Sequence, residues 1–189
     1  MEIEERITAS IGVKEKILAS PELLDTIGNV RQAITKAFSS KGKVFFCGNG
    51  GSAADAQHLA AEFSGRFYKN RPALYAEALH CNTSYLTAVA NDFSFEDVYA
   101  RLLEGLGNHG DVLVALSTSG NSENIVRAVE AAKKNGMIVV GMTGESGGRL
   151  KDQCHYLLRV PSADTPRIQE AHMLIGHIIC ELVESDLFS

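Results

Sequence analysis

The 189 residues include 45% hydrophobic and 22% charged side chains, ordinary proportions for a chain long enough to bury one core. The formal net charge of −5 argues against a nucleic-acid partner, because phosphate backbones select for clustered lysine and arginine. No stretch approaches the roughly 20 apolar residues that span a bilayer, and the N-terminus lacks a basic and apolar leader. We therefore expect a cytoplasmic protein without a membrane partner.

The first forty residues have a helical pattern. Apolar residues recur at helical spacing from Ile3 to Leu18. The sequence Ser20-Pro21-Glu22 is typical of a capped helix start with proline in the first turn, and this second helix is predicted to run to about Phe38.

The rest of the chain alternates short apolar runs with amphipathic stretches, which indicates a parallel sheet with right-handed crossovers. The predicted strands cover residues 43–47, 111–116, 137–142 and 156–160. The predicted helices between and after them cover residues 52–63, 123–134 and 167–187. We find no linker or repeat, so we predict one α/β domain over residues 1–189. Its expected form is a three-layer sandwich with a parallel central sheet and helical extensions at both ends.

A loop rich in hydroxyl groups follows the second predicted strand. It reads Ser117-Thr118-Ser119-Gly120-Asn121-Ser122 and directly precedes a helix. Hydroxyl groups, backbone N–H groups and the positive end of a helix dipole together suit a phosphate group. A plain helix cap would need only one of these side chains, so we predict a phosphate site here.

A glycine-rich turn, Gly48-Asn49-Gly50-Gly51-Ser52, follows the first predicted strand. It has neither GxGxxG spacing nor a GxxxxGK[ST] pattern, which argues against a nucleotide cofactor. Ligands of parallel sheets bind beyond the carboxyl ends of the strands, so a ligand could lie against this backbone. The alternative interpretation is a simple tight turn.

Two helices carry histidines that suit metal binding or proton transfer. His58 and Glu62 are four residues apart and share a helix face. Such a pair can bind a metal ion or share a proton, although an exposed polar face is the alternative. On the last helix, His172 and His177 differ by about 140° around the axis, so both cannot face one site and one of them should be structural.

These residues resemble the sugar isomerase (SIS) domain family, and within it the phosphoheptose isomerases. The resemblance covers nearly the whole chain and rests on CGNGGSAADAQHLAAEFSGRF, AVANDF, GDVLVALSTSGNS and RIQEAHMLIGH. It implies a flavodoxin-like SIS fold and a cytoplasmic homotetramer. The implied reaction converts sedoheptulose 7-phosphate into D-glycero-D-manno-heptose 7-phosphate, the first committed step towards the ADP-heptose of lipopolysaccharide and related glycans. Residues 1–40 would then contribute to the oligomer interface.

The resemblance also implies site residues. Matching positions suggest that one Zn²⁺ ion is bound by His58, Glu62, Gln169 and His177. The matching substrate contacts are Asn49, Gly50, Gly51, Ser52, Glu62, Asn91, Asp92, Ser117, Thr118, Ser119, Ser122 and Gln169. The resemblance also indicates that His177, and not His172, is the functional histidine. One departure is Pro166, which stands where some members carry an aspartate, with Asp164 nearby in sequence.

Aldose–ketose isomerisation needs a base at carbon and an acid at oxygen. Our hypothesis assigns Glu62 as base and His177 as acid, with a divalent ion as Lewis acid or organiser. Gln169 and His177 lie about 12 Å apart along one helix, whereas zinc ligands lie about 2 Å from the ion. Either the two side chains stretch toward each other or the ligands come from different subunits, and we therefore predict active sites at subunit interfaces.

Two other classes of protein compete with the enzyme. One is a non-enzymatic SIS adaptor resembling the DnaA initiator-associating protein, which shares the RIQE stretch but lacks the histidine that His177 supplies here. The other is a sugar-phosphate sensor, for which forty helical residues at the N-terminus leave little room for a DNA-binding module. We favour the enzyme because this chain has all four of the implied metal ligands, His58, Glu62, Gln169 and His177.

Overall fold

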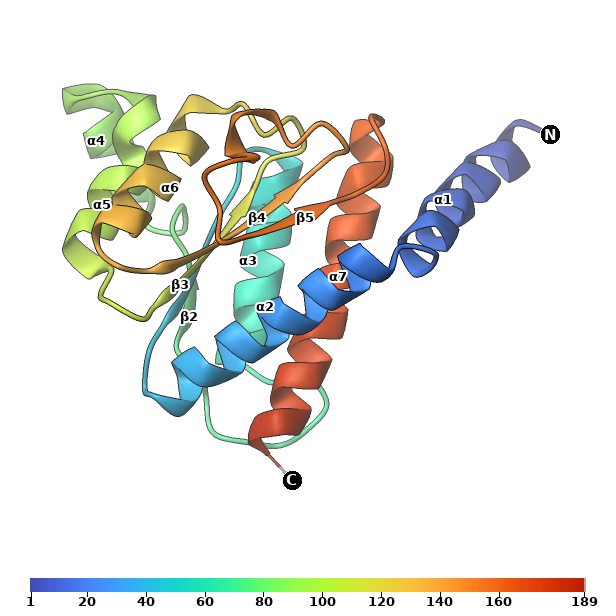
Figure 1. Ribbon diagram of the computed structural model, residues 1–189. Coiled ribbons are helices and arrows are strands. Elements are labelled where there is room, and N and C mark those ends of the chain that lie inside the picture. The colour runs from blue at the N-terminus through green and yellow to red at the C-terminus, as the bar shows by residue number, and fades with distance from the viewer. Residues whose placement is uncertain (189) are drawn as a thin grey trace.

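The computed structural model describes residues 1–188, and its centre is a parallel sheet of five strands in the order β2-β1-β3-β4-β5 (Figure 1). The strands are β1 (Val44–Cys47), β2 (Ala76–Ala78), β3 (Val112–Leu116), β4 (Ile138–Thr143) and β5 (Tyr156–Arg159). The strand order 2-1-3-4-5 is that of flavodoxin-like sheets, as the resemblance implies.

Helices cover both faces of this sheet (Figure 1). The α-helices are α1 (Glu2–Leu18), α2 (Pro21–Ser39), α3 (Gly51–Ser64), α4 (Thr83–Asp92), α5 (Val98–Leu106), α6 (Glu123–Lys134) and α7 (Thr165–Leu187). Short 3₁₀ turns occupy Phe95–Asp97 and Gly148–Leu150. The predicted three-layer α/β architecture is confirmed.

The core is divided by the sheet because side chains alternate along each strand. Val44 and Phe46 of β1 face a cluster shared with α2, α3 and α7, whereas Phe45 and Cys47 face a cluster shared with α5 and α6. α3 and α7 thus lie on the same face of the sheet. This placement allows residues that are distant in sequence to meet between the two helices.

The two N-terminal helices form where the sequence predicts them. Ser20 Oγ accepts a hydrogen bond from Leu23 N at 3.4 Å, and Pro21 follows at the first turn of α2. α1 extends outward from the body of the molecule (Figure 1). Its residues Ile3, Ile7 and Ile11 are 75%, 56% and 49% exposed, so one side of α1 is an uncovered apolar stripe.

Residues 65–110, for which the sequence predicts no element, contain β2, α4 and α5. β2 has only three residues, too few for a recognisable pattern. α4 begins at an asparagine cap, where Asn82 Oδ1 accepts a hydrogen bond from Tyr85 N at 3.0 Å. Among residues 1–188, no helix is long and apolar enough to cross a membrane.

Candidate functional site

The two predicted ligand loops lie side by side at the carboxyl edge of the sheet, because β1 and β3 are adjacent parallel strands. A reciprocal pair of amide hydrogen bonds joins the loops. Asn49 Nδ2 donates to Asn124 Oδ1 at 2.8 Å, and Asn124 Nδ2 donates to Asn49 Oδ1 at 2.9 Å. Asn124 is buried in the first turn of α6, so the glycine-rich turn is fixed relative to the hydroxyl loop.

The hydroxyl loop wraps around the N-terminus of α6. Ser117 is buried, and its Oγ donates to Ser122 Oγ at 3.4 Å. Ser122 is the N-cap residue, yet among the described residues no side chain caps the first turn of α6. The hydroxyl groups are therefore not used as a helix cap, and the positive end of the helix remains available to an anion.

A third turn, after β4, supports the hydroxyl loop and was not recognised in the sequence. Gly144 N donates to Thr118 O at 2.9 Å. Gly120 adopts a φ of +68°, and a Cβ added to it would lie 2.2 Å from Gly147 O. A Cβ on Gly148 would lie 2.3 Å from Ser119 O. Backbone packs directly on backbone here, which only glycine allows. The cluster of glycines after β4 was therefore the feature of the sequence that could have indicated this contact.

Tyr99 is another residue that the sequence analysis missed. This side chain is 2% exposed and its hydroxyl group donates to Gly48 O at 2.6 Å. The bond joins α5 to the start of the glycine-rich turn across 51 residues of sequence. No local pattern marks such a contact, because a tyrosine on an amphipathic helix is usually a core residue.

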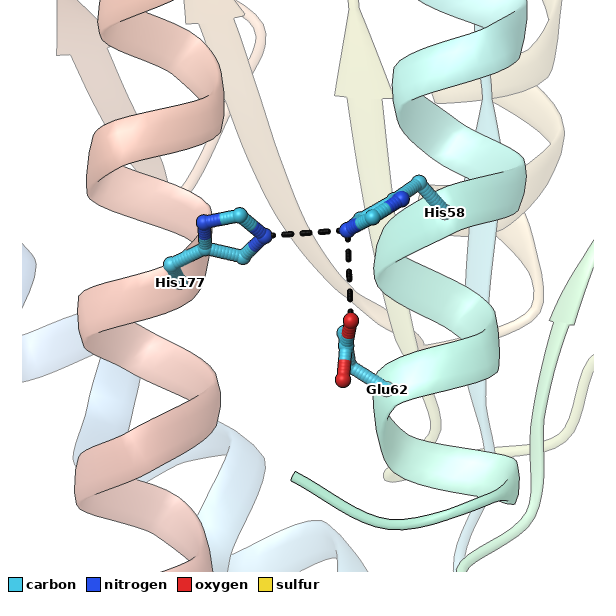
Figure 2. Close-up of side chains that lie close together, drawn as sticks. All are labelled: His58, Glu62 and His177. Atoms are coloured by element: carbon cyan, nitrogen blue, oxygen red, sulfur yellow. Dashed lines mark hydrogen bonds and ion pairs between the residues drawn. The ribbon is translucent and has the colours of Figure 1, made fainter. Parts of the chain in front are cut away.

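The principal side-chain cluster lies between α3 and α7 and consists of His58, Glu62 and His177 (Figure 2). His58 Nε2 lies 3.0 Å from His177 Nε2 and 3.2 Å from Glu62 Oε1. One ligand atom from each side chain lies within 4.8 Å of the others. Two imidazole nitrogens and one carboxylate form a donor set that zinc uses in proteins, so the three residues fit a metal ion.

Gln169 lies on α7 beside the glycine-rich turn. Its side chain packs against Gly51, where an added Cβ would lie only 2.5 Å from Gln169 Nε2. Gln169 and Pro166 also line an open cleft of about 570 Å³, together with Asp55 of α3. Asp55 therefore presents a carboxylate to the cleft that contains Pro166, whereas Asp164 is an exposed residue before α7.

The remaining predicted contacts lie around these elements. Asn91 and Asp92 form the exposed end of α4, where Asn91 Nδ2 donates to Asp92 Oδ1 at 2.9 Å. Ser52 is buried in the first turn of α3. Thr118 and Ser119 line a pocket of about 200 Å³ that also includes Ser162 and Thr165. This pocket borders the hydroxyl loop, and Glu145 also lines it.

His172 and His177 have different environments, as the angular argument predicts. His172 is fully buried, and its Nε2 lies 3.2 Å from Thr143 O. Burial lowers the pKa of His172 to about 4, against the opposing effect of the hydrogen bond to Thr143. His172 is thus a neutral structural residue that joins α7 to β4, whereas His177 is partly exposed and faces His58.

Comparison with known proteins identifies the family. The SIS domain family model matches residues 13–144. The chain belongs to the SIS domain family. It is 50% identical over 186 residues to the phosphoheptose isomerase of Aneurinibacillus thermoaerophilus, a match that covers 98% of this chain and 94% of that protein. It is 49% identical to the phosphoheptose isomerase of Clostridium acetobutylicum, with coverages of 98% and 95%.

Solved structures show the same similarity. A phosphoheptose isomerase from Francisella tularensis matches this SIS protein with a TM-score of 0.93 at 36% identity, covering 97% of each chain. A phosphoheptose isomerase from Neisseria gonorrhoeae matches with a TM-score of 0.87 at 41% identity, covering 97% of this chain and 99% of the other. The predicted membership of the SIS family is therefore confirmed.

Proposed function

We propose that this SIS protein is an aldose–ketose isomerase that converts sedoheptulose 7-phosphate into D-glycero-D-manno-heptose 7-phosphate. The observation that carries the proposal is the His58–Glu62–His177 cluster, which combines a carboxylate with two imidazoles between α3 and α7. The choice of reaction is supported by relatives named phosphoheptose isomerase, which are about 50% identical over nearly the whole chain.

The substrate would be anchored at its phosphate. Ser117, Thr118, Ser119 and Ser122 supply hydroxyl groups, and α6 directs the positive end of its dipole at the same loop. A phosphate held there would place the other end of the sugar toward the cluster between α3 and α7. Asn49, Gly50, Gly51, Ser52, Asn91, Asp92 and Gln169 are the proposed contacts along the rest of the sugar chain.

The reaction moves a proton between neighbouring carbons. In the proposed direction, Glu62 removes a proton from C1 of the ketose and returns it to C2 of the enediol. His177 gives a proton to O2 and accepts the proton of O1, so no net proton is consumed. The partly exposed positions of Glu62 and His177 leave both groups accessible to a sugar.

Zinc is the proposed cofactor, without a nucleotide. His58, Glu62 and His177 would hold the ion, and the proposed fourth ligand is Gln169. When bound, zinc supplies a fixed positive charge that polarises oxygen atoms. A carboxylate that binds zinc is a weaker base, so the ligand and base roles of Glu62 compete.

The proposed assembly is a homotetramer with active sites at subunit interfaces. Gln169 packs on Gly51 while His177 faces His58, and these two α7 residues are eight positions apart. A Gln169 side chain from a second subunit would complete the metal site without distorting α7. The exposed isoleucines of α1 supply an apolar surface for this association. Residues 1–40 would thus belong to the single domain and to the interface.

The test is incubation of the purified protein with sedoheptulose 7-phosphate while NMR monitors formation of the aldose. Parallel samples contain a chelator or added zinc. Formation of the heptose 7-phosphate supports the proposal. Absence of turnover, combined with binding to an initiator protein, would favour the adaptor, for which the relatives described above give no support.

A further inference from the structure

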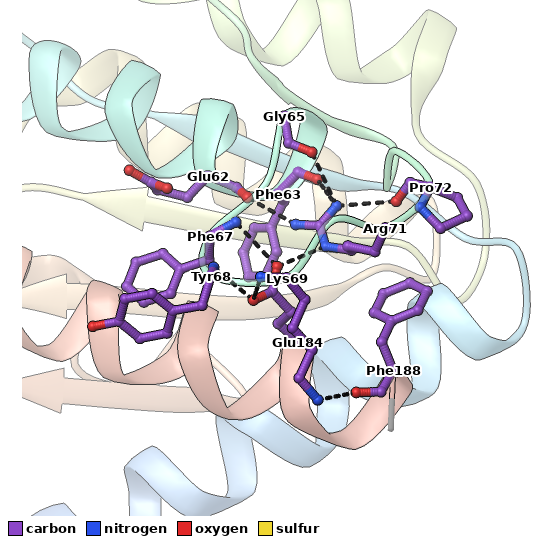
Figure 3. A network of polar contacts seen from close by, with 10 residues as sticks. All are labelled: Glu62, Phe63, Gly65, Phe67, Tyr68, Lys69, Arg71, Pro72, Glu184 and Phe188. Carbon is purple, nitrogen blue, oxygen red and sulfur yellow. Dashed lines mark hydrogen bonds and ion pairs between the residues drawn. The ribbon is translucent and has the colours of Figure 1, made fainter.

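A buried ion pair lies next to the proposed catalytic cluster but takes no part in the chemistry described above (Figure 3). Arg71 Nε lies 2.9 Å from Glu184 Oε1, and each side chain is only 2% exposed. Arg71 belongs to the segment that follows α3, and Glu184 lies near the end of α7. Because buried ion pairs lose hydration that their attraction need not offset, stability alone explains this pair poorly.

Glu184 binds three consecutive backbone amides of the segment after α3 (Figure 3). Its Oε1 accepts from Phe67 N at 3.0 Å, and its Oε2 accepts from Tyr68 N at 2.7 Å and from Lys69 N at 2.9 Å. With Arg71 Nε, four donors thus converge on one carboxylate. This single carboxylate therefore joins α7 to three consecutive residues of the chain beyond α3.

Arg71 binds the other end of the same segment, where α3 ends (Figure 3). Its Nη2 donates to Glu62 O at 2.9 Å, and its Nη1 donates to Phe63 O at 2.8 Å. Carbonyl groups in the last turn of a helix lack partners within the helix, and a positive charge there is favourable. The guanidinium group therefore caps the turn that carries the proposed base, Glu62.

The pair also reaches the proposed acid. Glu184 is seven residues after His177, two helical turns along the same face of α7. The segment held by Glu184 places the Phe67 ring against His177, with ring centroids 5.8 Å apart. Arg71 thus contacts the backbone of Glu62 on α3, and Glu184, through Phe67, supports His177 on α7.

We propose that Arg71 and Glu184 are positioning residues, which set the separation of α3 and α7 at which Glu62, His58 and His177 meet. The expected effect on turnover rests on the proposed isomerase function. The placement of the three metal-binding side chains can be measured independently of turnover. Neither Arg71 nor Glu184 is proposed to touch the substrate.

The informative variant is Glu184→Gln, which keeps the shape of the side chain. An amide has one acceptor oxygen, so its NH₂ group would face two of the four donors that now converge on Glu184. The matched control is Asp186→Asn on the same helix. Asp186 pairs with Arg31 of α2 and accepts from Thr35 at 3.1 Å, so it anchors α7 without touching the segment after α3.

Kinetics and zinc titration are measured on the complete protein for both variants, with folding checked by circular dichroism. We expect Glu184→Gln to lower kcat at least tenfold and to weaken zinc binding at least tenfold, with KM changed less than threefold. The small change in KM is expected because the phosphate loop lies elsewhere. Asp186→Asn should change each of these quantities less than threefold.

Arg71→Lys provides a second variant if Glu184→Gln does not fold. Lysine keeps the charge but cannot hold Glu184 and the two helix carbonyls at once, so kcat and zinc affinity should fall in the same direction. Folded variants with zinc affinity and kcat equal to those of Asp186→Asn would overturn the proposal. If the wild-type protein does not isomerise the sugar, the proposed function fails, while the zinc titration still decides whether the pair positions the cluster.

Discussion

His58 and His177 face each other with their Nε2 atoms 3.0 Å apart, although 119 residues separate them in the sequence. Two imidazole nitrogens can approach this closely when one proton lies between them or when a cation binds both. Glu62 Oε1 lies 3.2 Å from the same nitrogen of His58. The arrangement thus brings three groups that accept protons or metal ions to one point between α3 and α7.

Replacement of the proposed base should affect turnover more than binding. We expect Glu62→Gln to lower kcat by roughly 10²- to 10⁴-fold, the usual contribution of a general base, with KM nearly unchanged. The NMR assay with sedoheptulose 7-phosphate measures both quantities. Glu130→Gln, an exposed change on α6, is the matched control. Near-normal turnover of Glu62→Gln would show that another group removes the proton.

Zinc should stabilise the wild-type protein through the His58 cluster. At a free zinc concentration 100 times the Kd, binding stabilises a folded protein by about 2.7 kcal/mol. We expect a chelator to lower the melting temperature of the wild-type protein and to have little effect on His58→Ala. His109→Ala, a change in an exposed histidine, should retain the full response to zinc. If a chelator changed the melting temperatures of both variants equally, zinc would not be bound by the His58 cluster.

Local patterns predicted the elements that have strong periodicity and clear ends. The predicted helix at residues 123–134 matches α6 to the residue, because Ser122 precedes it and Asn135-Gly136 follows it. β2 escaped prediction because its three residues have no pattern of their own. It becomes a strand only because β1 offers it a parallel edge.

The site was predicted in parts. The hydroxyl loop and the His58–Glu62 pair are visible as local spacing, and the resemblance selected His177. The Asn49–Asn124 amide pair and the contact of Tyr99 with Gly48 join residues 75 and 51 positions apart. Such contacts depend on which strands become neighbours. A single sequence does not display this information locally.

Close backbone packing at Gly120 should be needed for phosphate binding. Gly120→Ala would place a Cβ 2.2 Å from Gly147 O at a φ of +68°, so the hydroxyl loop would have to shift. We expect KM for the sugar phosphate to rise at least tenfold. Gly110→Ala is the control, because Gly110 has a φ of +87° but its added Cβ would meet nothing within 4 Å. Both variants should lose about 1 kcal/mol or more of stability through backbone strain. If the two variants had the same KM, close packing at Gly120 would not be needed for phosphate binding.

His172 should make the protein less stable as the pH falls below about 6.5. Burial holds the pKa of His172 near 4 in the folded state, whereas an unfolded histidine titrates near 6.5. The unfolded state therefore binds the proton first, and roughly 3 kcal/mol of stability is lost between these pH values. Urea unfolding at pH 7.5, 5.5 and 4.5 measures the effect. His172→Gln should be less stable at pH 7.5 and should show a smaller loss on acidification. An unchanged pH dependence in this variant would contradict the assignment.

Glu184 should add a second loss of stability at lower pH. Burial opposes its ionisation, but the amides of Lys69, Phe67 and Tyr68 and the Arg71 guanidinium outweigh burial and lower its pKa to about 2. An unfolded glutamate titrates near 4.3, so the unfolded state binds the proton first as the pH falls. The contribution of the folded carboxylate is complete above about pH 4.3 and is lost progressively toward pH 2.

Urea unfolding between pH 5 and pH 2 tests this loss. The shift corresponds to roughly 3 kcal/mol, and Glu184→Gln should lack that part of the acid dependence while being less stable at neutral pH. His172→Gln is an internal control, because its own change is complete near pH 4 and it should retain the loss below that value. The same acid dependence in wild-type protein and Glu184→Gln would show that Glu184 is not ionised within its ring of donors.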